Sequence, residues 1–239
     1  MQCVILAGGR ATRMRPLTDR IPKALIPIDG RPFVDHQLEW LAGHGVTDVV
    51  LSVGYKGDAI RAYLDEDAGR RHGLGVRFVD EGDDLRGTAG ALRLALDQDV
   101  LEPSFLVTYG DSFLPIDFGA VFRAFGAAGR PALMTVFRND GRWDSSNVIF
   151  DGRMVNLYDK QRQTRPAADF AFIDYGLSAL SRRVIADGVA AGGRADLATV
   201  FHDLSVRGEL AGFEVGERFY EIGSPAGLED FANWLKQDG

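Results

Sequence analysis

The sequence predicts an α/β fold, in which helices flank a mostly parallel β-sheet. Three observations lead to this prediction. Short apolar runs of strand length alternate with longer runs of helical spacing through the first half of the chain. These short runs are apolar at nearly every position, as expected of strands that are covered on both faces. The 239 residues are 46% hydrophobic, which is enough apolar sequence for a substantial core.

The first half contains four expected strands and three expected helices. The expected strands are residues 3–6, 49–53, 76–79 and 105–109, and the expected helices are residues 33–41, 60–64 and 89–96. Alternation at this spacing indicates parallel strands, whose carboxyl ends meet at one edge of the sheet. The segments after Leu6 and Tyr109 are therefore expected at the edge where such sheets bind ligands.

The second half is less regular. Its expected strands are residues 133–137, 147–150, 154–158, 213–215 and 219–222, and its expected helices are residues 185–189 and 197–204. Asp151-Gly152 is a turn pair typical of a hairpin. A last helix is expected after Ser224, which suits the N-cap, with Pro225 at the first helical position. No linker-like segment interrupts the chain, so we expect one domain over residues 1–239.

Charge and cysteine content argue against several classes of protein. The formal net charge of −7 disfavours sequence-independent nucleic-acid binding, which needs a basic excess. The lone cysteine, Cys3, allows neither an internal disulfide nor a CxxC metal site. No apolar stretch is long enough to span a bilayer, and the first apolar run is too short for a secretory signal. We therefore expect a cytoplasmic protein that binds neither nucleic acid nor membrane.

A glycine-rich, basic segment follows the first strand. Gly8 and Gly9 allow backbone amides to approach a ligand without hindrance from Cβ atoms. Four cations follow, at Arg10, Arg13, Arg15 and Lys23. Converging amides and cations suit a polyphosphate, and a solvated surface loop is the alternative. The segment is neither a P-loop, in which a lysine follows a glycine directly, nor a G-x-G-x-x-G fingerprint.

A resemblance to a known family rests on residues 6–23. Their sequence, LAGGRATRMRPLT and then PK, resembles the L-A-G-G-x-G-T-R-L-x-P-L-T and P-K signature of the sugar-1-phosphate nucleotidyltransferases. The resemblance covers essentially the whole chain and continues through residues 87–91, 110–111, 159–160 and 221–225. The chain looks most like short bacterial members, namely mannose- or heptose-1-phosphate guanylyltransferases and N-acetylmuramate-1-phosphate uridylyltransferases.

This resemblance implies a fold, a reaction and a separate binding role for each half of the chain. The implied fold is a Rossmann-like sheet of the nucleotide-diphospho-sugar transferase type. Residues 1–115 would mainly bind the nucleotide, and residues 116–239 would mainly bind the sugar phosphate. The implied reaction is Mg²⁺-dependent transfer of a nucleotidyl group from an NTP, with GTP favoured, to a sugar 1-phosphate such as a heptose or mannose phosphate. The products would be an NDP-sugar and pyrophosphate.

The functional residues of the family map onto matching positions of this chain. The implied catalytic residues are Arg13, Lys23 and Asp111. The implied nucleotide-binding residues are Leu6, Ala7, Gly8, Gly9, Glu81, Gly87, Thr88 and Ala89. The implied acceptor-binding residues are Asn147, Asp159, Lys160, Asp174 and Gly176. The implied Mg²⁺ ligands are Asp111 and Glu221.

Position alone supports the role of Asp111. This residue follows an apolar strand and a glycine, so its carboxylate is expected at the ligand-binding edge of the sheet. Mg²⁺ prefers such oxygen ligands, usually one or two per ion. A turn or helix cap is the alternative role for Asp111. The alternatives elsewhere are a surface glutamate at Glu221 and an exposed ion pair at Asp159-Lys160.

Three departures from the family pattern concern the substrates more than the reaction class. Ala11 replaces the third glycine of the signature, and a positive φ there would cost alanine roughly 1 kcal/mol. Glu221 stands where aspartate is usual. Asp174 stands where asparagine is frequent, and an ionised carboxylate only accepts hydrogen bonds.

Two other functions remain open at this point. A cytidylyltransferase for a non-sugar phosphate such as phosphocholine shares the signature, and it would need an aromatic cage. The candidate cage residues are Tyr158, Phe170, Phe172 and Tyr175, which are also expected core residues. A catalytically silent nucleotide-sugar sensor is the second alternative, and the presence of Arg13, Lys23 and Asp111 argues against it.

Overall fold

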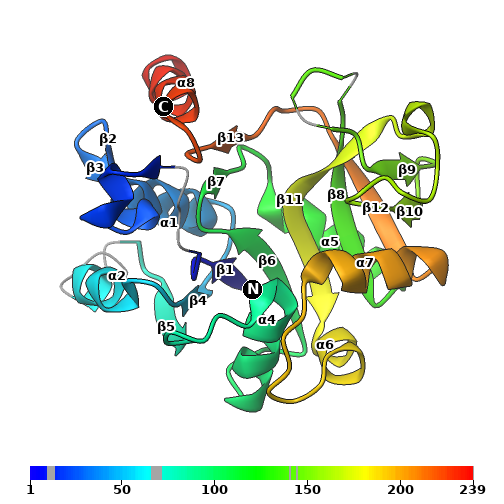
Figure 1. Cartoon of the computed structure of the whole chain (residues 1–239), viewed down its shortest axis with the longest axis horizontal. Coiled ribbons are helices and arrows are strands. Elements are labelled where there is room, and N and C mark those ends of the chain that lie inside the picture. Colours follow the sequence, from blue (N-terminus) through cyan, green and yellow to red (C-terminus); the bar gives the residue numbers. More distant parts are fainter. Residues whose placement is uncertain (10–13, 66–71, 140, 144, 239) are drawn as a thin grey trace.

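A computed structural model describes residues 1–9, 14–65, 72–139, 141–143 and 145–238. Among these residues, nine strands form one mixed sheet, with helices packed on both of its faces (Figure 1). Seven of these strands follow one another across the sheet, and two more extend it from one of the seven. The fold class predicted from the alternating runs is confirmed.

Four parallel strands form the first half of the sheet. They are β1 (Gln2–Leu6), β4 (Asp48–Val53), β5 (Gly75–Asp80) and β6 (Ser104–Tyr109). β1 lies between β4 and β6, and β5 pairs with β4. In this register Leu6 lies beside both Ser52 and Tyr109. The segments that follow these strands therefore meet at one edge of the sheet, as the sequence predicts.

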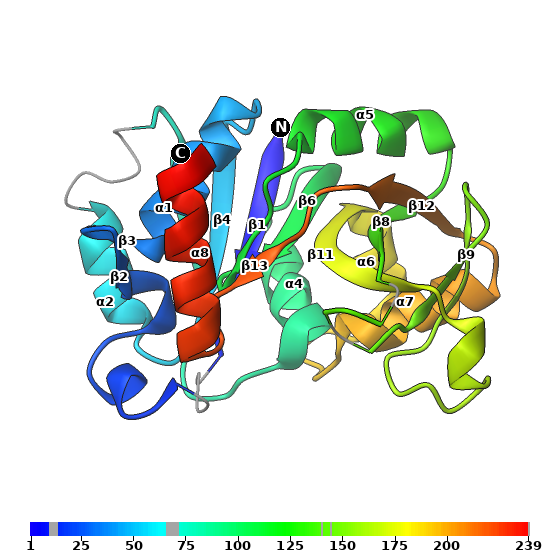
Figure 2. The same ribbon diagram turned by 90° about the horizontal axis from the view of Figure 1, so that it is seen from above.

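Helices cover both faces of the sheet. Successive side chains of a strand point to opposite faces, so apolar side chains on both faces need a layer of helices to bury them. One layer contains α1 (Phe33–Gly43), α2 (Gly57–Tyr63) and α5 (Phe118–Ala128), and the other contains α4 (Gly87–Asp97), α6 (Arg182–Gly188) and α7 (Leu197–Val206). Figure 2 shows α5 and α7 on opposite sides. In β1, Cys3 and Ile5 pack with the first layer, and Val4 packs with the second. All three side chains are fully buried.

An antiparallel strand joins the two halves of the chain. β11 (Phe172–Ser181) pairs with β6 and with β8 (Ala132–Arg138), and β8 pairs in parallel with β12 (Leu210–Val215). The expected hairpin of β9 (Val148–Phe150) and β10 (Val155–Tyr158) joins the same sheet through β11. The halves thus share one continuous sheet.

Two of the longer elements, α5 and β11, are absent from the sequence-based prediction. α5 buries Phe118, Val121 and Phe125, but glycines and alanines fill most of its other positions and weaken the apolar pattern. β11 contains a register shift between Asp174 and Ser178 against β8, so its alternation of buried residues is interrupted. In both cases a local irregularity hides an element that the sheet then stabilises.

The last helix packs on a separate pair of strands. The remaining elements are β2 (Pro27–Ile28), which pairs with β3 (Arg31–Pro32), β7 (Ser112–Phe113), which pairs with β13 (Tyr220–Glu221), and α8 (Pro225–Asp238). Phe231 of α8 is fully buried among Phe113 and Tyr220. The Gly227 amide donates to Ser224 Oγ at 3.1 Å, which confirms the predicted start of the helix. Within the described parts of the chain, no helix is long and apolar enough to cross a membrane.

Candidate functional site

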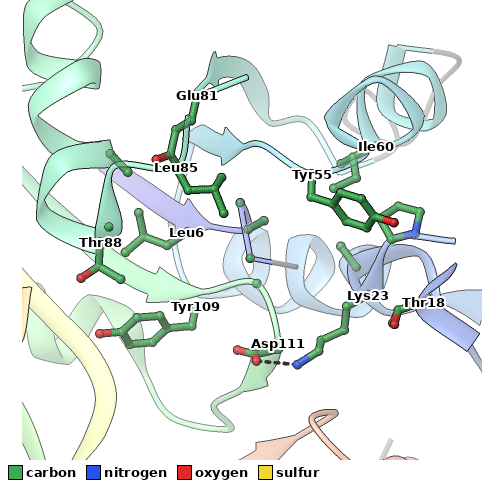
Figure 3. A pocket seen from close by; sticks show the side chains of 18 residues that line it. Leu6, Thr18, Lys23, Tyr55, Ile60, Glu81, Leu85, Thr88, Tyr109 and Asp111 are labelled. Carbon is green, nitrogen blue, oxygen red and sulfur yellow. Dashed lines mark hydrogen bonds and ion pairs between the residues drawn. The ribbon is translucent and has the colours of Figure 1, made fainter. Parts of the chain in front are cut away.

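A cavity of about 390 Å³ lies at the carboxyl edge of the four parallel strands (Figure 3). The segments after β1, β4, β5 and β6 and the first turn of α4 surround it. The cavity is lined by Leu6, Ala7, Gly8, Gly9, Thr18, Pro22, Lys23, Ala24, Tyr55, Ile60, Glu81, Leu85, Gly87, Thr88, Ala91, Tyr109, Gly110 and Asp111. Nine of these residues are among those that the family resemblance implies, so the structure brings that part of the predicted site together.

Two glycines let the walls of the cavity come close to one another. A Cβ atom on Gly8 would lie 2.6 Å from Glu81 Oε1, and a Cβ atom on Gly110 would lie 2.7 Å from the Ala7 side chain. Glycine is required at Gly110, because the neighbouring Ala7 atoms belong to a short side chain and the backbone and cannot move aside. At Gly8 a Cβ atom would instead displace the end of the Glu81 side chain. At Gly9 a Cβ atom would meet no atom of the described residues within 4 Å, so these residues leave the backbone there open to a ligand.

Lys23 and Asp111 form an ion pair at one side of the cavity (Figure 3). Lys23 Nζ donates to Asp111 Oδ2 at 2.8 Å. The Lys23 side chain is 13% exposed and the Asp111 side chain is 35% exposed, so the carboxylate remains open to the cavity. Asp111 reaches this place because it follows Gly110 at the end of β6. The pair combines a cation for phosphate oxygens with a carboxylate suited to a hard metal ion.

Glu81 lies on the other side of the cavity from that ion pair (Figure 3). Its Oε2 accepts a hydrogen bond from the Arg86 amide at 2.8 Å. Burial raises the pKa of the Glu81 carboxyl, and the hydrogen bond and charge of Arg86 oppose that rise. The site therefore carries an acceptor group at one side and a cation at the other.

The predicted turn at the start of α4 forms a further wall. Gly87 has a φ of 75°, in the left-handed region that favours glycine, and Thr88 lines the cavity beside it. Ala89 is fully buried and does not line the cavity; its amide donates to the Ala195 carbonyl at 3.0 Å. Arg13, the third predicted catalytic residue, lies outside the described residues.

The predicted acceptor-binding residues lie outside this cavity, and three of them contact one another. The Asp174 amide donates to Asn147 Oδ1 at 3.1 Å, and Asp174 Oδ1 accepts from the Gly176 amide at 3.0 Å. Burial raises the pKa of the Asp174 carboxyl to about 6, against the Gly176 hydrogen bond and the positive charge of Lys160. A Cβ atom on Gly176 would lie 3.9 Å from the Tyr109 ring, so Tyr109 stands between this group and the cavity.

Asp159 holds a loop through both of its carboxylate oxygens. Its Oδ1 accepts from the amides of Gln161 and Arg162, and its Oδ2 accepts from the amides of Gln163 and Thr164 and from the Thr164 hydroxyl. Burial raises the pKa of this carboxyl, but these hydrogen bonds outweigh it and lower the pKa to about 2. The structure thus gives Asp159 a local role in shaping the 159–164 loop. Its predicted contact with the acceptor stays a prediction.

Glu221 lies on the strand next to Asp111. It pairs with Ser112 in the β13–β7 ladder, and the Ile222 amide donates to the Asp111 carbonyl at 2.9 Å. The two predicted metal ligands are therefore on neighbouring segments. In the described parts of the chain, no group of three or more His, Cys, Asp or Glu side chains is placed to hold a metal ion.

Several lining residues were not among the predicted site residues. The additional side chains are Thr18, Pro22, Ala24, Tyr55, Ile60, Leu85, Ala91, Tyr109 and the backbone of Gly110. Tyr55 follows β4 and Tyr109 ends β6, so the rule that ligands bind at the carboxyl ends of parallel strands was the signal for both. Lys56 draws the Thr18 segment to the cavity, because its ammonium donates to the Thr18 carbonyl at 3.2 Å.

Comparison with known proteins agrees with this geometry. A family model described as the MobA-like NTP transferase domain matches residues 3–202. A mannose-1-phosphate guanyltransferase of Kluyveromyces lactis is 43% identical over 167 residues, which cover 67% of this chain and 44% of that protein. A D-glycero-α-D-manno-heptose 1-phosphate guanylyltransferase of Aneurinibacillus thermoaerophilus is 32% identical over 122 residues, which are 51% of either chain.

A solved structure extends the comparison over the whole chain. HddC from Yersinia pseudotuberculosis is 26% identical, with a TM-score of 0.79, and the match covers 98% of this chain and 99% of that one. The chain spans about half the length of the curated relatives it matches, or less. The family model covers residues 3–202, which is most of the chain. The chain therefore belongs to the MobA-like NTP transferase domain family.

Proposed function

We propose that this protein transfers a nucleotidyl group from an NTP to a sugar 1-phosphate and releases pyrophosphate. The observation that carries the proposal is the cavity itself, in which the Lys23–Asp111 pair lies across from the Glu81 carboxylate. A nucleoside triphosphate has a neutral base at one end and a polyanion at the other, and this polarity matches that of the cavity. The family membership and the names of the relatives support the same reaction class.

The reaction requires positioning and charge neutralisation more than proton transfer. The attacking group is a phosphate monoester with a second pKa of about 6, so it is already largely dianionic at neutral pH and needs no general base. Lys23 would neutralise charge on the phosphate oxygens, because Asp111 holds its ammonium at one side of the cavity. The open backbone at Gly9 would let amides approach the phosphates. Arg13, four residues further along the chain than Gly9, is proposed to assist.

Asp111 and Glu221 fit a magnesium ion. Mg²⁺ is usually held by one or two carboxylates, with phosphate and water oxygens completing its shell. Asp111 lines the cavity, and Glu221 follows on the neighbouring strand within one residue of register. When bound there, the ion would neutralise charge on the triphosphate. We propose these two residues as its ligands.

We propose GTP as the nucleotide. Guanine presents two adjacent donors, N1–H and the 2-amino group, which together match one ionised carboxylate. Glu81 provides a carboxylate on the side of the cavity away from Lys23 and Asp111, where the base would lie. Two relatives are named as guanyl- or guanylyltransferases, which supports the same choice. The acceptors in their names, mannose and heptose phosphates, support a sugar acceptor rich in hydroxyl groups. We propose that such hydroxyl groups donate to Asp174.

Replacing Glu81 by glutamine tests this choice of base. The amide keeps an acceptor oxygen for the Arg86 amide, but its NH₂ group would face the guanine donors. We expect kcat/KM for GTP to fall roughly a hundredfold, with a smaller change for the other nucleotides. Glu39→Gln is the matched control, because Glu39 is an exposed glutamate paired with Arg31. An equal loss with every NTP would show that Glu81 does not select the base.

The reaction itself is tested by pyrophosphate release with Mg²⁺ across GTP, UTP, CTP and dTTP, combined with a panel of sugar 1-phosphates and phosphocholine. We expect the strongest signal with GTP and a mannose or heptose 1-phosphate. Release with phosphocholine and CTP would replace this proposal by the cytidylyltransferase alternative. Nucleotide binding without release in any combination would favour the sensor.

The structure gives the cytidylyltransferase alternative no additional support. The four aromatic residues that would form a cage are all buried in the hydrophobic interior, and none lines the cavity: Tyr158, Phe170, Phe172 and Tyr175. A cation-binding cage needs ring faces open to the ligand. A cytoplasmic location and the absence of nucleic-acid and membrane partners stay predictions from the sequence.

A further inference from the structure

Residues 193–197, in the second half of the chain, pack against the Gly87-Thr88 turn that lines the cavity. The Ala195 carbonyl accepts from the amides of Ala89 and Gly90 at 3.0 and 3.1 Å, and the Ala195 amide donates to the Arg86 carbonyl at 2.9 Å. A Cβ atom on Gly87 would lie 2.6 Å from the Ala195 carbonyl oxygen, so the two backbones are in direct contact. The 193–197 segment therefore supports the turn from behind.

Thr88 and Asp196 connect the same two segments through their side chains. Thr88 Oγ1 donates to Asp196 Oδ1 at 2.8 Å and accepts from the Leu197 amide at 2.7 Å. The same Asp196 oxygen accepts from the Ala198 amide at 3.1 Å and so caps α7. Thr88 lines the cavity, whereas Asp196 does not. Both hydrogen-bonding functions of the threonine hydroxyl are thus used to hold it in place.

Asp196 is suited to this contact because its carboxylate is ionised. Burial raises its pKa, but the hydrogen bonds from Ala198 and Thr88 and the charge of Lys160 outweigh burial and lower the pKa. Hydrogen bonds to a charged acceptor are stronger than those to a neutral one. Lys160 is one of the predicted acceptor-binding residues. The charge of Asp196 therefore interacts with a residue that is predicted to bind the second substrate.

We propose that Asp196 is a positioning residue for the nucleotide: through Thr88 it fixes the Gly87-Thr88 turn in its binding conformation, so a residue of the second half sets the affinity of the first half for NTP. The inference rests on one part of the proposed function, namely that this cavity binds the nucleotide. It assigns Asp196 no contact with either substrate.

Asp196→Ala is expected to raise the KM and Kd for Mg-GTP about tenfold, with kcat changed less than about twofold. Asp196→Asn should restore most of the affinity, because its side-chain oxygen can still accept from Thr88 and Ala198. Asp117→Ala is the matched control. Asp117 also caps a helix, since its Oδ1 accepts from the Ala120 amide at 3.0 Å, but it lies outside the cavity. Asp117→Ala should lower the melting temperature about as much as Asp196→Ala does, and it should leave nucleotide affinity unchanged.

A double-mutant cycle separates positioning from a general loss of structure. If Asp196 acts through Thr88, Thr88→Val and Asp196→Ala together should weaken binding no more than the stronger single change. Additive losses, or equal losses of affinity in Asp117→Ala and Asp196→Ala, would overturn the proposal.

Direct titration of Mg-GTP by calorimetry keeps this test separate from turnover. A wild-type protein that binds nucleotide without turnover would refute the proposed reaction and leave the Asp196 prediction intact. If wild type binds another of UTP, CTP or dTTP more tightly than GTP, that nucleotide is the probe. Failure to bind any of the four would overturn both proposals.

Discussion

Replacing Asp111 by asparagine is expected to reduce turnover by roughly a thousandfold while the fold is retained. The change removes the negative charge that a magnesium ion would require and leaves a side chain of the same size. The position is partly open to the cavity, and Lys23 can keep a hydrogen bond to the amide oxygen, so we expect little change in the melting temperature. The measurement is kcat by pyrophosphate release at saturating nucleotide, with circular dichroism to verify the fold.

Asp187→Asn is the matched control for this substitution. Asp187 lies on α6, pairs with Arg183 at 3.0 Å and does not line the nucleotide cavity, so its loss should leave turnover unchanged. A titration with Mg²⁺ adds a second readout, because Asp111→Asn should also raise the metal concentration needed for half-maximal activity. A variant that keeps wild-type turnover and metal dependence would refute Asp111 as a metal ligand.

Lys23→Met is expected to lower kcat roughly a hundredfold. Methionine has a similar length and an apolar stem, so it fills the same space without the ammonium group. The loss would reflect charge neutralisation that the triphosphate needs most as pyrophosphate departs, so kcat should fall more than nucleotide affinity. The measurement compares kcat with the Kd for Mg-GTP in the same variant.

Lys236→Met provides the corresponding control, because Lys236 is an exposed lysine in the last turn of α8. Its removal should change neither constant. A Lys23→Met variant whose affinity falls a hundredfold with an unchanged kcat would indicate that the ammonium binds the ground state only. That result would remove Lys23 from the catalytic residues and keep it as a binding residue.

Most of the first half of the fold was predictable because three of its strands, β1, β4 and β6, are buried on both faces. Such strands are apolar throughout, and Gly8 and Asp111 lie where these runs end, so the sequence indicated the strands and the edge together. The second half was less predictable, because the register shift after Asp174 interrupts β11. The strand exists because β6 and β8 supply partners on both sides, and a local pattern does not contain that information.

The site shows the same limit in its side chains. The sequence placed Lys23 and Asp111 in one site through the family signature, and the 2.8 Å contact agrees. The sequence could not indicate that the Asp159 carboxylate accepts five hydrogen bonds from its own loop. Nor could it indicate Asp196, whose partner Thr88 is 108 residues away along the chain. Contacts of this kind depend on the completed fold.

The position of β11 has an evolutionary consequence. This one strand pairs with β6, which ends beside Asp111, and with β8 and β9 of the second half. The loops that follow those outer strands can therefore vary in sequence while the strands beside the proposed nucleotide cavity keep their positions. If the proposed function holds, a change in these loops alone would be enough to change the acceptor. The shared sheet makes the diversification of substrates a matter of surface change on a constant scaffold.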